Sequence, residues 1–498
     1  MGKDQVGVIR QYDFSYGPNY TDSIYSLNDK ELAEAENMMW DGELKTIPGA
    51  GRYISSAVGG TTHNFTGIYQ YVTKNLATAT VVATDAGRVM YNNAGSWSVL
   101  AGGLSTSATA FWDWVVFNNT LIGLSGSNPV KKWGGAGATF GNLGGSPPQS
   151  KYGSHHAVDF LFFAGHTNHP SQIRYSDTAT AETWPAGNAL EIGRDDNQII
   201  TGLQRFGDST AVFKNSSIWL VSGNTPTDFS PTPTPSDVGC VAPNSIVLTD
   251  AGIFFWSEAG PALFNGFKST LLGKRLKSVL DGVDWANTSK IWAAYYPARK
   301  QILVGYQRSG QSTPDRMLLL DLYRLGDNNN TPPAFWPITV TGAQVMTNAI
   351  DSATNIRKIM MGHSTGHVTT WDNGSATFNT NTIIPRIRTG ALHLGKPDRV
   401  QLVRDMTLRA KAQTGRISVR FAMDGIQTFT THASTPYSTS KSGYDVHQKM
   451  LQGDGAGDYP VGNIIQLDVI ATGSTGFNLH GYEIGTETTS RRDPIPNG

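Results

Sequence analysis

Residues 199–223 read IITGLQRFGDSTAVFKNSSIWLVSG, and the pattern of this stretch predicts β-structure. Its apolar runs are short and are separated by Gly, Asp and Asn residues, and Trp219 stands near its end. Short runs rich in β-branched and aromatic residues, bounded by turn-forming residues, are typical of β-strands. The stretch therefore predicts an apolar strand, a tight turn and a second strand that ends close to an aromatic residue.

The same arrangement recurs along most of the chain. It occurs in residues 78–100, 110–133, 157–185, 199–223, 244–266, 290–339 and 343–374. The aromatic positions near the ends are Trp97, Trp133, Trp184, Trp219, Phe264, Trp336 and Trp371. Units of about 30 to 50 residues are the size of propeller blades. We therefore predict an all-β fold whose residues 53–378 form a β-propeller of about seven blades, with six or eight blades, or an array of β-sandwiches, as the alternatives.

The two ends of the chain have different patterns. Residues 379–498 contain longer alternating strands and end in a polar tail, which predicts a separate C-terminal β-sandwich. Residues 1–52 form an N-terminal arm in this division of the chain. Residues 267–282 are expected to form a short helix within the propeller, because leucines recur there at every fourth position.

The arm contains the signals of one short helix. Asn28 can cap a helix, and Glu31 follows at the spacing of a capping box. Four apolar residues then share one face at helical spacing. We expect a helix over residues 29–39, whose apolar face is a possible subunit-contact surface formed by Leu32, Ala35, Met38 and Met39.

Composition restricts the classes of function. Formal net charge is zero over 498 residues, so bulk charge does not draw the chain to nucleic acid or acidic lipid. The single cysteine, Cys240, excludes an intrachain disulfide and a zinc–cysteine cluster, and we expect it to be buried. No apolar stretch of about 18 residues is present, so no membrane-spanning segment is expected. The N-terminus lacks the apolar core of a signal peptide, which predicts folding in a reducing compartment.

Net neutrality hides a basic segment in residues 383–420. Only Asp398 and Asp405 oppose nine basic residues there. These are Arg386, Arg388, Lys396, Arg399, Arg404, Arg409, Lys411, Arg416 and Arg420. The segment is either the solvated polar face of a sheet or a face that meets phosphates of DNA or an acidic partner. Aromatic residues are not interleaved with these cations, so stacking on single-stranded bases is not expected.

The sequence offers no convincing catalytic site. Residues 175–184, YSDTATAETW, approximate the Asp-box turn of sialidase propellers, which is structural and not catalytic. His155, His156, His166 and His169 match no metal-ligand spacing and are expected on the surface and in loops. No nucleophile elbow, zinc-protease motif or P-loop is present. We therefore predict no enzymatic activity, no catalytic residue, no metal and no cofactor.

The arm and several later phrases together resemble one protein family. Phe14, Gly17 and Asn19 match an opening motif, and the phrases at 160–185, 209–223, 239–266 and 384–412 follow in the family's order. A second motif is matched, with shifted spacing, by Leu27, Glu31, Ala35 and Asn37. Residues 47–49 have Ile where the family's third motif has Arg. In these features the chain resembles the propeller-type tail hub or nozzle proteins of short-tailed, podovirus-like bacteriophages.

The resemblance implies a structural role in the virion. Members of that family form homo-oligomeric rings, commonly of about six subunits, around the channel that retains and then passes the genome. The implied partners are the head-to-tail adaptor, other tail proteins and non-specific double-stranded DNA in the channel. The implied location is the phage tail, after assembly in the bacterial host cytoplasm. The helix expected at 29–39 would be part of an inter-element or inter-subunit clamp.

Two other functions stay open at this point. One is a carbohydrate-binding or glycan-hydrolysing propeller of a receptor-binding tail component. The other is a cytosolic scaffold propeller that binds a peptide at its mouth.

Overall fold

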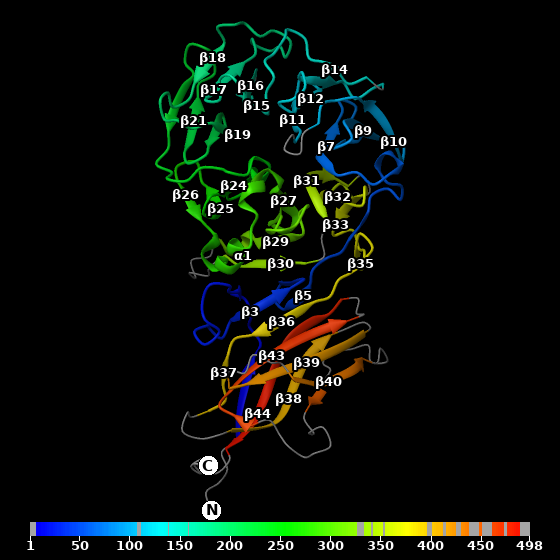
Figure 1. Cartoon of the computed structure of the whole chain (residues 1–498), viewed down its shortest axis with the longest axis vertical. Helices are drawn as coiled ribbons and strands as arrows, with labels where there is room; N and C mark the ends of the chain where they lie inside the picture. The colour runs from blue at the N-terminus through cyan, green and yellow to red at the C-terminus, as the bar shows by residue number, and fades with distance from the viewer. Residues whose placement is uncertain are drawn as a thin grey trace, which may run out of the picture.

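The computed structural model describes most of the chain, and nearly all of its regular structure is β (Figure 1). The described residues are 6–106, 111–137, 139–157, 159–325, 333–339, 342–351, 354–395, 401–411, 415–424, 430–437, 448–450, 461–472 and 476–488. Within these ranges the one α-helix is α1 (Lys277–Asp281). The 3-10 turns are η1 (Val58–Gly60), η2 (Pro243–Ser245), η3 (Gly273–Arg275), η4 (Trp285–Lys290), η5 (Pro297–Arg299) and η6 (Leu322–Arg324).

Six four-stranded antiparallel sheets follow one another along the chain. The first contains β7 (Phe65–Val72), β8 (Thr78–Thr84), β9 (Arg88–Asn93) and β10 (Ser96–Ala101). The second contains β11 (Asp113–Phe117), β12 (Thr120–Leu124), β13 (Lys131–Trp133) and β14 (Gly141–Asn142). The third contains β15 (Tyr152–His156), β16 (Phe160–Ala164), β17 (Gln172–Tyr175) and β18 (Ala189–Glu191).

In the next three sheets, as in the first three, each strand pairs with the strand that follows it along the chain. The fourth contains β19 (Ile200–Phe206), β20 (Ser209–Lys214), β21 (Ile218–Ser222) and β22 (Ser230–Pro233). The fifth contains β23 (Val247–Thr249), β24 (Gly252–Ser257), β25 (Gly260–Phe264) and β26 (Ser269–Leu271). The sixth contains β27 (Trp292–Tyr296), β28 (Gln301–Tyr306), β29 (Arg316–Asp321) and β30 (Phe335–Ile338).

A seventh sheet joins distant parts of the chain. It contains β31 (Ala343–Ile350), β32 (Arg357–His363), β33 (Val368–Trp371), β34 (Thr377–Phe378) and β35 (Asn381–Thr382). The early strand β6 (Ala50–Arg52) pairs antiparallel with β33. The first strand of each sheet contacts the first strand of the next, and β31 contacts β7, so the series closes on itself (Figure 1). We call these seven sheets the sheet ring.

Three inner strands of the sheet ring are buried along their whole length because both of their faces are covered. All residues of β16, β24 and β28 are buried. A strand packed between two sheets loses the apolar–polar alternation of a half-exposed strand. Gly252 opens β24 at φ +134°, and a Cβ atom there would lie 2.3 Å from the Phe264 carbonyl oxygen, so this turn requires glycine.

Two seven-stranded sheets combine strands from both ends of the chain. One contains β1 (Val6–Gln11), β4 (Met38–Trp40), β5 (Leu44–Thr46), β38 (Gln401–Lys411), β41 (Gln448–Met450), β42 (Val461–Gly462) and β44 (Asn478–Thr488). The other contains β2 (Gly17–Pro18), β3 (Glu31–Glu36), β36 (Arg386–Thr389), β37 (Leu392–His393), β39 (Gly415–Met423), β40 (Thr430–Tyr437) and β43 (Ile464–Thr472). The arm therefore shares its sheets with residues after 386.

The expected helix over residues 29–39 is wrong. Strands β3 and β4 occupy this segment, and Asn37, at φ +56°, separates them. The capping-box contact does exist, since the Asn28 backbone N–H donates to Glu31 Oε2 at 3.0 Å, but it closes a turn that leads into β3. Pairing of β3 with β36 outweighs the local helical signals.

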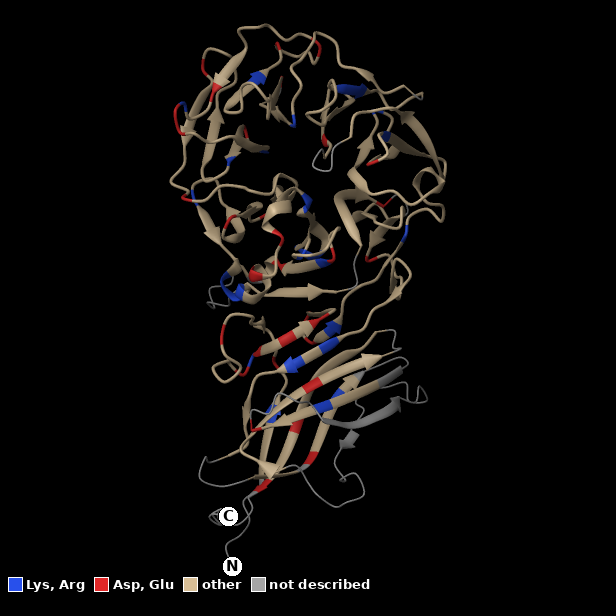
Figure 2. Ribbon diagram, in the orientation of Figure 1, with Lys and Arg blue, Asp and Glu red and all other residues tan. Residues whose placement is uncertain are grey.

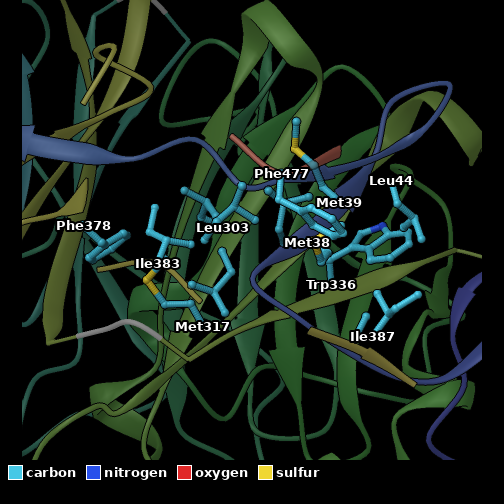
Figure 3. Packing of buried hydrophobic residues seen from close by; sticks show 14 of the residues in the cluster. Met38, Met39, Leu44, Leu303, Met317, Trp336, Phe378, Ile383, Ile387 and Phe477 are labelled. Atoms are coloured by element: carbon cyan, nitrogen blue, oxygen red, sulfur yellow. The ribbon is translucent and has the colours of Figure 1, made fainter. Parts of the chain in front are cut away.

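The four apolar residues of this segment make an inter-element contact inside the chain. Leu32, Ala35, Met38 and Met39 are 0–3% exposed. Met38 and Met39 pack with Trp336 of the sheet ring, and all four belong to one hydrophobic cluster that reaches both seven-stranded sheets (Figure 3). Of the two roles that the sequence left open, these side chains therefore fill the contact between elements of one chain.

The helix expected over residues 267–282 is much shorter in the structure. The strand β26 and the turn η3 occupy its first part, and α1 is only five residues long. Gly273 lies in the middle of the segment, where glycine disfavours a continuous helix.

Candidate functional site

The basic segment contributes to a row of charges across four neighbouring strands. Glu34, Arg388, Asp468 and Arg420 are successive cross-strand neighbours on β3, β36, β43 and β39. We call these four residues the charge row. Figure 2 shows basic and acidic positions adjoining one another on strands in the lower half of the molecule. The alternation of sign places each arginine next to a carboxylate, which favours the pairing of these strands.

Asp468 is the centre of the charge row. Its side chain is 0% exposed, and Arg386 donates from Nε and Nη2 to its two carboxylate oxygens, each at 2.9 Å. Arg420 donates to the same carboxylate. Burial raises the pKa of Asp468, but hydrogen bonds from Arg386 and the charges of Arg386, Arg420 and Arg388 outweigh it and hold this pKa below its ordinary value.

A second carboxylate ties the arm to this cluster. Arg388 Nη1 donates to Glu34 Oε1 at 2.7 Å, and Arg386 Nη1 lies 3.9 Å from Glu34 Oε2. The hydrogen bond to Asp468 raises the pKa of Arg386. Since β3 comes from the arm and β36 from the far end of the chain, these ion pairs also fix the two segments to each other.

The other residues of the basic segment are placed as follows. Arg409 donates from Nη2 to Glu483 at 2.9 Å. Arg404 and Lys411 belong to β38, and Arg416 belongs to β39. Lys396 and Arg399 lie outside the described residues. Contact of this segment with DNA stays a prediction, and at Arg386, Arg388, Arg409 and Arg420 a phosphate would have to compete with carboxylates of the chain itself.

A cavity of about 840 Å³ lies among the first strands of the sheet ring. Residues of β7, β11, β15, β19, β23, β27 and β31 line it, together with residues of η2 and η4. Binding sites for small molecules commonly have volumes of about 300 to 1,000 Å³. The size and the central position make this cavity the second candidate site.

Asp113 is the acidic residue of the cavity wall. Its carboxylate accepts hydrogen bonds from the backbone N–H groups of Trp114 (2.9 Å) and Gly153 (2.8 Å). Burial raises its pKa to about 6, although these two hydrogen bonds lower it in part. Sequence reasoning did not identify Asp113 as a site residue. The available signal is a single acidic residue within the otherwise apolar stretch FWDWVVF of residues 111–117.

The expectation of surface histidines is wrong for two of the four. His156 is buried, stacks on Phe162 at 4.1 Å between ring centroids, and contacts the Gly223 carbonyl oxygen at 2.9 Å. His166 is also buried. Burial lowers the pKa of both, so they are neutral packing residues at pH 7.

Cys240 is buried, as expected, and burial raises its pKa to about 12. Among the described residues, no three His, Cys, Asp or Glu side chains come together in a way that could hold a metal ion. The described part of the chain also contains no helix that is long and apolar enough to cross a membrane.

Comparison with known proteins yields similarity only at the level of structure. A scan of protein-family models gives no match, and a search of curated proteins gives none either. The extracellular domain of a protein described as a hybrid two component system from B. thetaiotaomicron has a TM-score of 0.41 at 10% identity, over 65% of this chain and 39% of that chain. BamB from Moraxella catarrhalis has a TM-score of 0.39 at 11% identity, over 74% of this chain and 98% of that chain.

Proposed function

We propose that the sheet ring is a seven-bladed β-propeller and that the two seven-stranded sheets form a β-sandwich with the arm built into it. Two observations support this proposal. The first strands of the seven sheets contact one another in a closed series. Strand β6 supplies the fourth strand of the last blade, so the ring is closed by hydrogen bonds between distant parts of the chain.

We further propose that the chain is a structural virion protein of a phage tail, a hub or nozzle. The observation that carries this proposal is one continuous hydrophobic core. It extends from Val82 in the first sheet through Trp336 in the sixth and Met38 in the arm to Leu467 and Ile484 in the seven-stranded sheets. Domains move relative to one another unless the interface between them is large and hydrophobic. A chain whose two parts share a core is suited to hold a fixed shape in an assembly.

In this role six or so copies form a subunit ring around the DNA channel, and each copy meets its neighbours through the same pair of surfaces. The paired charges of the charge row fit a wall past which DNA must slide, because a phosphate finds few unengaged cations there. The subunit ring would contact the head-to-tail adaptor on one side and other tail proteins on the other. The work of the chain is mechanical, so no residue has a catalytic role.

The protein content of purified particles tests this role. Particles produced from the genome that encodes this chain should contain the chain after density-gradient purification, at a copy number close to that of the other tail-ring proteins. Quantitative mass spectrometry of the particles gives that number. Absence of the chain from infectious particles would contradict the proposal.

A further inference from the structure

One part of the cavity wall brings hydroxyl groups and a positive charge together. Ser125, Gly126 and Ser127 follow strand β12, and they line the cavity with Lys151, the residue that precedes β15. The Lys151 side chain lies across Gly126, since a Cβ atom at Gly126 would be 2.4 Å from Lys151 Cγ and 3.3 Å from Lys151 Cε. The glycine therefore leaves room for the lysine to lie along the Ser-Gly-Ser segment.

Hydrogen bonds decide which way the two hydroxyl groups point their protons. Asn128, which is 5% exposed, donates to Ser125 Oγ from its backbone N–H at 3.2 Å and from Nδ2 at 3.1 Å. Both lone pairs of Ser125 Oγ are then filled, so its O–H must donate, and Ser127 Oγ lies 3.5 Å away. Ser127 Oγ also accepts from Asn128 Nδ2 at 3.4 Å. The Ser127 O–H is therefore left as a donor without an acceptor in the described part of the chain.

Lys151 adds a positive charge that the described part of the chain does not neutralise. Its side chain is exposed and has neither an ion pair nor a hydrogen bond with any described residue. Asp113 is the one acid among the lining residues, and the backbone N–H groups of Trp114 and Gly153 already hold its two oxygens. Arg205 is a second lining cation without a described carboxylate partner. Positive charge therefore exceeds negative charge on this wall.

We propose that the cavity binds a small oxyanion, either a phosphate ion or the phosphate group of a small molecule, at Lys151 and Ser127. The charged oxygens of a phosphate only accept hydrogen bonds, which suits an ammonium group and a hydroxyl group that is held as a donor. The cavity volume of about 840 Å³ is in the range of small-molecule sites. This inference does not depend on the tail role, because a monomer would contain the same cavity.

Titration of the full chain with defined probes tests the proposal. The probes are inorganic phosphate, glucose 6-phosphate and, as the neutral counterpart, glucose, each up to about 10 mM at constant ionic strength. Calorimetry and phosphorus NMR should show saturable binding of a phosphate probe and no binding of glucose. Tighter binding of glucose 6-phosphate than of inorganic phosphate would identify a phosphorylated small molecule as the ligand, and the reverse order would identify the free ion. Absence of saturable phosphate binding, or glucose binding as tight as that of glucose 6-phosphate, overturns the proposal.

Variants locate the anion. Lys151→Gln removes the ammonium charge and should weaken phosphate binding about tenfold or more, and Ser127→Ala should weaken it about threefold. Lys268→Gln is the matched control, because Lys268 is also an exposed lysine but does not line the cavity. Asp113→Asn should tighten phosphate binding at about pH 8, where a carboxyl group with a pKa of about 6 is charged and repels an anion.

Thermal melting verifies that each variant is folded. Both lysines are exposed, so the comparison of Lys151→Gln with Lys268→Gln decides the test even if another variant does not fold. Phosphate binding that Lys151→Gln leaves unchanged, or that Lys268→Gln weakens equally, would place the anion elsewhere and overturn the proposal. Weaker phosphate binding by a folded Asp113→Asn variant would contradict it as well.

Discussion

At the scale of single residues, the buried carboxylate Asp468 is the common partner of two arginines in the charge cluster. Asp468→Asn leaves the guanidinium groups of Arg386 and Arg420 without their common counter-charge. Breaking a buried ion pair costs about 3 to 5 kcal/mol, so we expect a loss of this order in the free energy of unfolding measured with urea. Glu483→Gln is the control, because Glu483 faces Arg409 in a more exposed pair and should have a much smaller effect. Equal effects of the two substitutions would contradict this account of the charge row.

The same pairing predicts the outcome of charge reversal. Arg386→Glu places a third carboxylate beside Asp468 and Glu34. We expect this variant to be less stable than the unmodified chain already as a monomer, because buried like charges repel. Melting temperature of the monomer gives the readout. A fully stable Arg386→Glu monomer that fails only in assembly would instead support direct contact of this arginine with a partner or DNA.

Asp113 gives a prediction with a defined pH window. Its pKa is raised from 3.8 to about 6 in the folded chain, so the folded state holds a proton that the unfolded state releases between these values. The contribution of Asp113 to stability is therefore fully present below about pH 4 and is lost as the pH rises through 6. Asp113→Asn stays neutral, so its stability relative to the unmodified chain should rise between pH 4 and 6 and then level off. Urea unfolding of both proteins across this range measures the difference, and a constant difference would refute the assignment.

At the scale of elements, the contact between the arm and the sheet ring depends on large apolar side chains. Met38 is 0% exposed and packs near Trp336 (Figure 3). Met38→Ala should lower the free energy of unfolding by about 2 to 5 kcal/mol, the usual cost of a large-to-small change in a core. Leu76→Ala is the control, since Leu76 is 82% exposed. A Met38→Ala variant as stable as the control would mean that the arm does not hold the two parts together.

The elements also show what the sequence could and could not predict. Each of the seven repeated stretches supplies strands to a different sheet. These strands could be predicted because short apolar runs and turn residues are local signals in the sequence. Strand β6 has no such signal: it is Ala-Gly-Arg, and its partner β33 lies more than 300 positions away. The helix prediction for residues 29–39 is wrong for a related reason. The helical signals of this segment are local, whereas β36, the strand that pairs with β3, lies about 350 positions away. Cavity residues come from seven different strands, one in each sheet of the sheet ring, and only the closed series of sheets brings them together.

At the scale of the whole molecule, the shared hydrophobic core predicts cooperative unfolding. Residues of the sheet ring and of both seven-stranded sheets belong to one cluster. Calorimetry should therefore show one main transition, in which the two parts unfold together. Two well-separated transitions would show that the parts are independent, and would remove the observation on which the mechanical role depends.

The proposed role requires copies of this chain to close into a ring, and the mass and shape of the purified particle test this. Mass photometry with negative-stain electron microscopy, on the protein alone and together with the proteins encoded beside it, gives both quantities. Closed rings of about six subunits with a central pore are expected, since identical head-to-tail contacts close by rotation. A monomer that persists under both conditions would contradict it.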